Sequence, residues 1–259
     1  MRTALCLVLP LLALLACSEP GQTEVARGNV LASRGKLTEA IEAYRAAAKA
    51  APRKARPREL LGHVLFDQGR FAEARTAYQE ALGLEPAAAL EARIGLARVE
   101  AEEGKLKEAI EHLGRVISDQ PGNVYARLSR ANLAMRRGGE KDAELAISDT
   151  AEAMKVDADN ASVLYTRGCA FLAAHEPGKA SEAFRVLENA HPHSPLAPYG
   201  QARVAAAAQK RADVVLHLRE TKARARSVTG AWSPDDILKD PAFLFMKDDP
   251  DFLRELQDP

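Results

Sequence analysis

The sequence has few aromatic residues, no net charge and little cysteine. Aromatic side chains make up 5% of the 259 residues while hydrophobic residues reach 47%, so a core has to be built largely from Ala and Leu. These two residues have high helix propensities, and such a composition is typical of a helical protein. The 36 basic and 36 acidic side chains balance, which gives the chain no global attraction to nucleic acid or anionic lipid.

The longest apolar run lies at the N-terminus. Met1-Arg2-Thr3 precedes an uncharged stretch from Ala4 to Ala16, which is too short to cross a bilayer as a helix and has the length of a secretory signal. We expect residues 1–16 to be a signal peptide. The run ends in Leu14-Leu15-Ala16-Cys17, which resembles a bacterial lipobox and implies cleavage before Cys17 and lipidation of that cysteine. The alternative is an ordinary secretory cleavage near Ala16 that leaves Cys17 unmodified.

The resemblance to a lipobox also implies a location. Ser18 stands where an aspartate favours inner-membrane retention in many Gram-negative bacteria, so we expect an outer-membrane lipoprotein of the bacterial cell envelope that faces the periplasm. Residues 17–23 are then a lipidated tether, and acyl chains hold it at the membrane. The mature chain retains only Cys169 as a possible thiol, too few for an internal disulfide, and we interpret it as a small buried hydrophobe.

A seven-residue pattern returns about every 34 residues. It reads Gly35-Lys36-Leu37-Thr38-Glu39-Ala40-Ile41, then Gly69-Arg70-Phe71-Ala72-Glu73-Ala74-Arg75, then Gly104-Lys105-Leu106-Lys107-Glu108-Ala109-Ile110. A proline follows each copy, at Pro52, Pro86 and Pro121. A fixed period of this length predicts an all-α solenoid, in which each unit buries its apolar face against its neighbours.

The clearest unit spans residues 55–88. Gly69 is placed to end a first helix with a positive φ, and Pro86 ends the second helix because proline cannot continue a helix interior. The signature residues of the unit are Leu61, Gly62, Leu65, Gly69, Phe71, Ala74, Tyr78, Ala81 and Pro86. They resemble the tetratricopeptide repeat, which implies a right-handed α-solenoid of antiparallel helix pairs.

The other units match with decreasing fidelity. We expect five such repeats over residues 24–194 and a degenerate sixth over 195–228. The fourth repeat carries three extra residues, which we place in the turn around Gly138-Gly139-Glu140-Lys141. In the fifth, His175 stands at the expected glycine, and we assign the turn to Pro177-Gly178 instead.

The remaining residues, 229–259, predict a helical cap on the last repeat. Ser233-Pro234, Asp240-Pro241 and Asp249-Pro250 each place a capping side chain before a proline at the first helical position. Trp232, Phe243, Phe245 and Leu253 would cover the last repeat, as solenoid ends require for solubility. The cap is acidic and the helix before it is basic, so we expect the two to dock partly by charge.

Titratable residues do not assemble into a catalytic or metal-binding motif. The histidines are scattered over different repeats, and the pair His191 and His193 has no further ligand at metal-binding spacing. No glycine-rich phosphate loop is present. The basic run from Arg53 to Arg58 has no interleaved aromatic residue, so we predict a solvated loop and no nucleic-acid partner. We therefore predict a protein that is not an enzyme and has no cofactor.

The resemblance implies that a concave groove, lined by the first helix of each repeat, binds segments of other proteins. Val25 stands where arrays that clamp a terminal carboxylate carry a lysine, so that subtype is not expected. The early groove positions present Asn29, Arg56, Glu59, His63, Asp67 and Arg98, and the later ones Tyr125, Leu128, Asn132, Met135, Tyr165, Tyr199 and Arg203. Tyr, Met and Arg are enriched at interface anchors, although some of these side chains could instead pack against neighbouring helices.

The sequence thus predicts a periplasmic scaffold that binds partner proteins or peptides and is held at the membrane by its lipid. Within this class it leaves open a pilotin that assembles a type IV pilus secretin, and an adaptor for cell-wall hydrolases or for outer-membrane assembly. A different alternative is a groove that binds a glycan or lipid.

Overall fold

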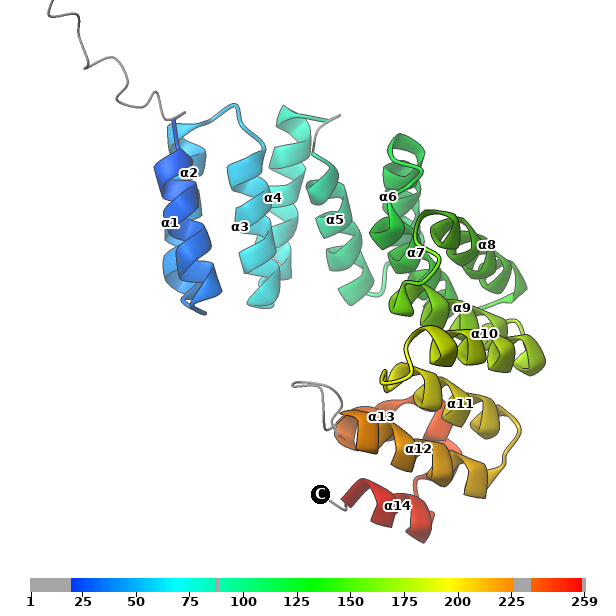
Figure 1. Ribbon diagram of the computed structural model, residues 1–259. Helices are drawn as coiled ribbons and strands as arrows, with labels where there is room; N and C mark the ends of the chain where they lie inside the picture. The colour runs from blue at the N-terminus through cyan, green and yellow to red at the C-terminus, as the bar shows by residue number, and fades with distance from the viewer. Residues whose placement is uncertain (1–19, 87–88, 226–233, 258–259) are drawn as a thin grey trace, which may run out of the picture. The chain divides into compact units, whose positions relative to one another are not determined.

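In the computed structural model the described residues are 20–86, 89–225 and 234–257, and every regular element among them is a helix (Figure 1). The expected signal peptide, Cys17, Trp232 and Ser233 lie outside these residues. The chain divides after Val99 into two units, and each is described separately.

The first unit contains two complete helix pairs and most of a further helix. Its helices are α1 (Gln22–Ser33), α2 (Leu37–Ala50), α3 (Arg56–Asp67), α4 (Phe71–Leu84) and α5 (Leu90–Glu102), of which α5 runs across the division. Helix α1 packs on α2, α2 on α3, and α3 on α4 (Figure 1). Helix α1 begins at Gln22, inside the segment that we assigned to the tether.

The second unit continues the same alternation. It contains α6 (Leu106–Asp119), α7 (Val124–Arg137), α8 (Glu140–Val156), α9 (Ala161–Ala173), α10 (Pro177–Ala190), α11 (Leu196–Ala207) and α12 (Arg211–Ala225). Consecutive helices from α6 to α12 pack on one another. The pair α11 and α12 has the same helix–turn–helix form, in the segment that we expect to be a degenerate sixth repeat.

Left-handed residues join the two helices of most pairs. Gly35 and Gly69 both have φ of 72°, as the sequence predicts. In the fifth pair our assignment of the turn was wrong: His175 itself takes φ of 58°, while Pro177 and Gly178 already belong to the first turn of α10. Proline is favoured at this first helical position because its missing N–H leaves no hydrogen bond unmade.

The three extra residues of the fourth repeat were also misplaced. Only Gly138 and Gly139 separate α7 from α8, and α8 has 17 residues where α10 has 14. The insertion therefore lengthens the helix by most of a turn. Glu140 and Asp142 lie in that added turn, where carboxylates interact favourably with the positive end of the helix dipole.

Buried rings fill the gaps that glycine leaves between first helices. A Cβ atom on Gly62 would lie 2.5 Å from the Tyr78 ring, and one on Gly95 would lie 2.2 Å from it. Phe184 lies in the same way between Gly168 and Gly200. Tyr78 and Phe184 are both fully buried. In a chain with few aromatic residues, a single ring therefore fills each of these contacts between two first helices.

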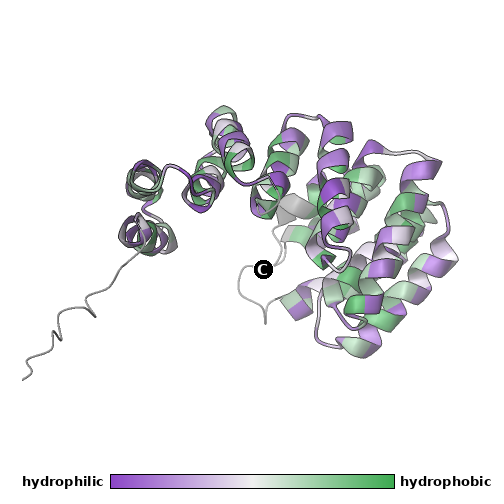
Figure 2. Cartoon of the chain, turned by 90° about the horizontal axis from the view of Figure 1, so that it is seen from above, coloured by the Kyte–Doolittle hydropathy of each residue, from purple (hydrophilic) through white to green (hydrophobic). Residues whose placement is uncertain are grey.

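Around the helices, hydrophobic and hydrophilic residues lie on different sides (Figure 2). Ala40, Ala74 and Ala81 are completely buried in the first unit, which agrees with the expectation of a core rich in alanine. None of the helices in the described part of the chain is long and apolar enough to cross a membrane.

The predicted cap is formed by α13 (Pro234–Lys239), the 3₁₀ helix η1 (Pro241–Met246) and α14 (Pro250–Gln257). The Asp240 side chain accepts a hydrogen bond from the Ala242 N–H, and Asp249 accepts one from the Phe252 N–H, which confirms two of the three predicted helix caps. Phe243 and Phe252 are buried in one cluster with residues of α11 and α12. The cap therefore covers the sixth pair, as the sequence predicts.

Candidate functional site

The groove positions of the first unit are polar. Arg56, Glu59 and His63 lie along α3, and Glu59 is only 5% exposed with its carboxylate 3.5 Å from the Arg56 guanidinium. Burial raises the pKa of the Glu59 carboxyl, and Arg56 opposes that shift. Burial also lowers the pKa of His63, so its imidazole is neutral at pH 7.

Core tyrosines position two of these polar side chains. The hydroxyl of Tyr78, which reaches past Gly62, lies 3.0 Å from Nδ1 of His63. The Tyr44 hydroxyl similarly passes Gly28 and donates to Asn29 at 2.8 Å. Sequence reasoning missed this link between the core and the groove. Its signal is a polar residue directly after the repeat glycine together with tyrosine at the core aromatic position.

Arg98 completes the polar surface of the first unit. Its guanidinium lies 4.0 Å from the centre of the Phe66 ring and 3.8 Å from the Asp67 carboxylate. The first unit thus presents both charge signs at its groove positions, held by contacts within the unit.

In the second unit the groove positions of α7 are largely uncharged. Tyr125 is 55% exposed and Asn132 is also exposed. Leu128, which lies between them in the sequence, is half-buried. Met135 is half-buried and packs against two apolar clusters. Tyr125, Leu128 and Asn132 share one side of α7, because residues three and seven positions apart on a helix face the same way.

Tyr165, Tyr199 and Arg203 are held in contacts with other helices. The two tyrosine rings stack with centres 6.4 Å apart, and Arg203 donates a 3.4 Å hydrogen bond to the Tyr165 hydroxyl. Burial raises the pKa of both phenols, and the Asp240 hydrogen bond adds to the rise at Tyr199. Arg203 also lies 3.2 Å from the sulfur of buried Cys169, whose thiol pKa is raised by burial.

The cap reaches this network directly. The Tyr199 hydroxyl donates to Asp240 at 2.6 Å, and the Phe243 ring meets the Tyr199 ring edge-on with centres 5.7 Å apart. Tyr199 is only 5% exposed as a result. Among the groove positions of the second unit, Tyr125 and Asn132 remain exposed while Tyr199 contacts the cap.

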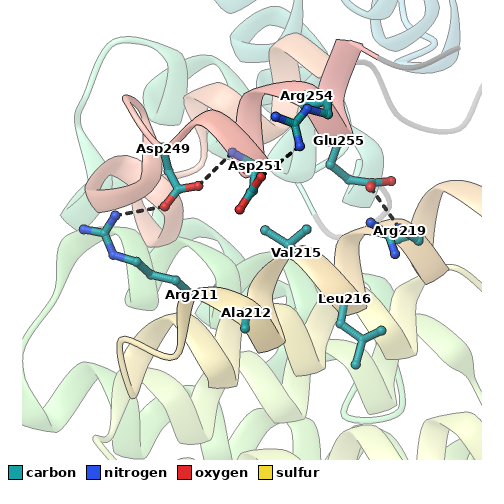
Figure 3. Close-up of a pocket in the computed structure, with 9 residues that line it drawn as sticks. All are labelled: Arg211, Ala212, Val215, Leu216, Arg219, Asp249, Asp251, Arg254 and Glu255. Atoms are coloured by element: carbon teal, nitrogen blue, oxygen red, sulfur yellow. Dashed lines mark hydrogen bonds and ion pairs between the residues drawn. The ribbon is translucent and has the colours of Figure 1, made fainter.

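Ion pairs also join α14 to α12, as Figure 3 shows. Arg211 lies 2.9 Å from Asp249, and Arg219 lies 3.0 Å from Glu255. They border a hollow of about 630 Å³ whose base includes Val215. This arrangement agrees with the expected docking of an acidic cap on a basic helix.

Over the described residues, no group of three or more His, Cys, Asp or Glu side chains is arranged to hold a metal ion. The histidines His191 and His193 follow α10, and the His191 ring contacts the backbone carbonyl of Asp159.

A family model described as tetratricopeptide repeat matches residues 25–92, 59–124 and 94–161, which together span more than half of the sequence. The chain belongs to the tetratricopeptide repeat family. No curated protein sequence matches the chain.

Solved structures of tetratricopeptide repeat proteins share the fold. One from Parabacteroides merdae aligns with a TM-score of 0.74 at 15% identity and covers 91% of this chain and 90% of its own. The Pseudomonas aeruginosa protein pilF aligns with 0.63 at 14% identity, covering 82% and 93%. YrrB, described as a tetratricopeptide repeat protein with an unusual peptide-binding site, aligns with 0.54 at 20% identity, covering 68% and 89%. At these identities the similarity establishes the fold, and the tetratricopeptide fold supports a role as a protein-interaction scaffold.

Proposed function

We propose that this protein is a scaffold of the bacterial cell envelope that holds a segment of a partner polypeptide against its first helices and is tethered to the membrane through lipid on Cys17. The observation that carries the proposal is the exposed face of α7. Tyr125 at 55% exposure, with exposed Asn132 and half-buried Leu128, combines an aromatic anchor, an amide and an apolar contact on one side of a helix.

These residue types suit a polypeptide partner. A buried tyrosine ring is among the strongest contributors to protein interfaces, and an asparagine side chain can pair with a partner backbone through its N–H₂ and C=O. The first unit supports the same role with different chemistry. Its groove positions carry pre-positioned polar groups, in which the Tyr78 and Tyr44 hydroxyls hold His63 and Asn29.

The test is site-specific photo-crosslinking in intact cells. A photoreactive amino acid replaces Tyr125, and a second variant carries it at Val156 of α8, which is 57% exposed and lies outside the groove positions. We expect a discrete protein adduct from position 125 and none from position 156. Equal labelling from both positions, or adducts with lipid alone, would contradict binding at the α7 face.

Tethering is tested separately. Metabolic labelling with palmitate should mark the wild type and a Cys169→Ala variant but not a Cys17→Ala variant. Lipidation of Cys17 would be contradicted if the Cys17→Ala chain still carried the label or if the wild type did not. Neither result would contradict the scaffold role.

The identity of the crosslinked species separates the narrower candidates. A secretin subunit would support a pilotin for a type IV pilus, whereas a cell-wall hydrolase or an outer-membrane assembly factor would support an adaptor role. A small glycan or lipid ligand would instead raise the melting temperature with no protein captured.

A further inference from the structure

The fourth and fifth repeats place an arginine at the same position. Arg130 follows the helix-capping residue Asn123 of α7 by seven residues, and Arg167 follows Asn160 of α9 by the same interval. The second helices of the two repeats, α8 and α10, also align when residues are counted back from the cap residue at each C-terminal end. Asp149 precedes the cap residue Asp157 of α8 by eight residues, and Ala183 precedes the cap residue His191 of α10 by eight.

In the fourth repeat the arginine is neutralised. Asp149 is 1% exposed and accepts hydrogen bonds from Nε and Nη2 of Arg130, both at 2.7 Å. Arg127 adds a third bond to the same carboxylate at 3.2 Å. A paired carboxylate at this depth offsets the cost of burying the guanidinium groups.

In the fifth repeat the carboxylate is missing. Ala183 occupies the position of Asp149, and Leu164 occupies the position of Arg127. Nη1 of Arg167 is buried, and the described part of the chain provides no hydrogen-bond acceptor for it. The guanidinium lies 4.9 Å from the centre of the Phe171 ring, which supports it from one side but gives Nη1 no acceptor.

A hollow of about 260 Å³ lies beside Arg167 and Ala183 and is lined by residues of α8, α9 and α10. Its walls are mostly apolar, from Met154, Leu164 and Val186. Two further charged side chains border it and have partners of their own: Lys179 lies 2.7 Å from Glu176, and Glu182 pairs with Arg185.

We propose that this hollow binds an acidic side chain of a partner polypeptide, together with an apolar side chain next to it. The carboxylate would take the place that Asp149 fills in the fourth repeat, and the apolar group would contact Leu164 and Met154. The volume is below the roughly 300–1,000 Å³ typical of small-molecule sites, which favours one or two side chains over a whole free ligand. The residues that line the hollow come from α8, α9 and α10, and the inference rests on the proposed function only in that the partner is a polypeptide.

The first test restores the missing carboxylate. Ala183→Asp should supply Arg167 with the partner that Arg130 already has, and the melting temperature of the full chain should rise by about 2–6 °C. The matched control is Ala183→Asp in an Arg167→Leu chain, where the new carboxylate lacks the arginine and the melting temperature should fall relative to Arg167→Leu alone. A fall for Ala183→Asp in the wild-type chain of the same size as in the Arg167→Leu chain would overturn the proposal.

The second test measures binding by NMR on the full chain in detergent. The probe is the blocked pentapeptide Ala-Ile-Ser-Asp-Thr, which copies residues 146–150 around Asp149, and its Asn analogue is the matched control. We expect the Asp peptide to shift resonances around Arg167 with a Kd at least tenfold lower than that of the Asn peptide. Arg167→Leu and Ala183→Asp should each abolish these shifts. Equal binding of both peptides, retained binding in Arg167→Leu, or the same response to acetate alone would each contradict a site for an acidic peptide.

Discussion

Replacing Gly62 by alanine tests how the repeats pack. The new Cβ atom would lie 2.5, 2.7 and 2.8 Å from three atoms of the Tyr78 ring. The ring cannot move away easily, because it is fully buried and is also in contact with Gly95 on its other side.

The change in the free energy of unfolding is the sum of two destabilising effects and one stabilising effect. Overpacking of a filled core costs about 1–3 kcal/mol. A displaced ring also loses its hydrogen bond to His63, worth about 0.5–1.5 kcal/mol. Alanine in place of a helical glycine returns up to about 1 kcal/mol of helix propensity. From the middle of these ranges, the net expectation is a destabilisation of about 2–2.5 kcal/mol, or roughly 4–10 °C in melting temperature.

Thermal unfolding followed by circular dichroism measures this shift, and Gly83→Ala provides the control. Gly83 also lies in a helix of the first unit, but no atom comes within 4 Å of a Cβ placed there. That variant should keep or slightly raise the melting temperature. If Gly62→Ala proved as stable as Gly83→Ala, the close ring contact would not hold the repeats together and the reasoning would fail.

Three further predictions concern charge. Asp149→Asn should destabilise the second unit by about 3–5 kcal/mol in thermal unfolding, because it leaves two largely covered arginines without their buried carboxylate, whereas the exposed Asp251→Asn should change little. The hydrogen bond from Arg137 lowers the pKa of Asp142, so its contribution to stability is complete above the unfolded pKa of about 3.9 and is lost as pH falls below it. Melting curves from pH 6 to 2 should therefore show a smaller acid loss for Asp142→Asn than for wild type. Finally, 1 M NaCl should increase proteolytic cleavage of the cap, because the ion pairs between α12 and α14 include exposed arginines; unchanged cleavage would assign the docking to apolar contacts alone.

Much of the fold could be predicted because its determinants are local. A glycine at a helix end, a proline after the next helix and an Asp-Pro pair before a short helix each act within a few residues. The repeat period then specifies which faces meet, since each unit packs mainly on its neighbours. The two wrong assignments concern turns where the chain has local alternatives of similar free energy. His175 adopts the left-handed turn that glycine usually provides, and the extra residues of the fourth repeat extend α8.

The candidate site was less predictable, because exposure depends on distant parts of the chain. Tyr125 and Tyr199 are both tyrosines at groove positions, yet one is 55% exposed and the other 5%. The difference arises from Asp240 and Phe243, more than 40 residues after Tyr199, which cover it. Likewise, Arg130 and Arg167 are equivalent in the repeat, and their environments differ because the facing helix carries Asp149 in one case and Ala183 in the other. Short-range sequence patterns therefore determine the helices and their order, whereas long-range packing determines which side chains remain open to a partner.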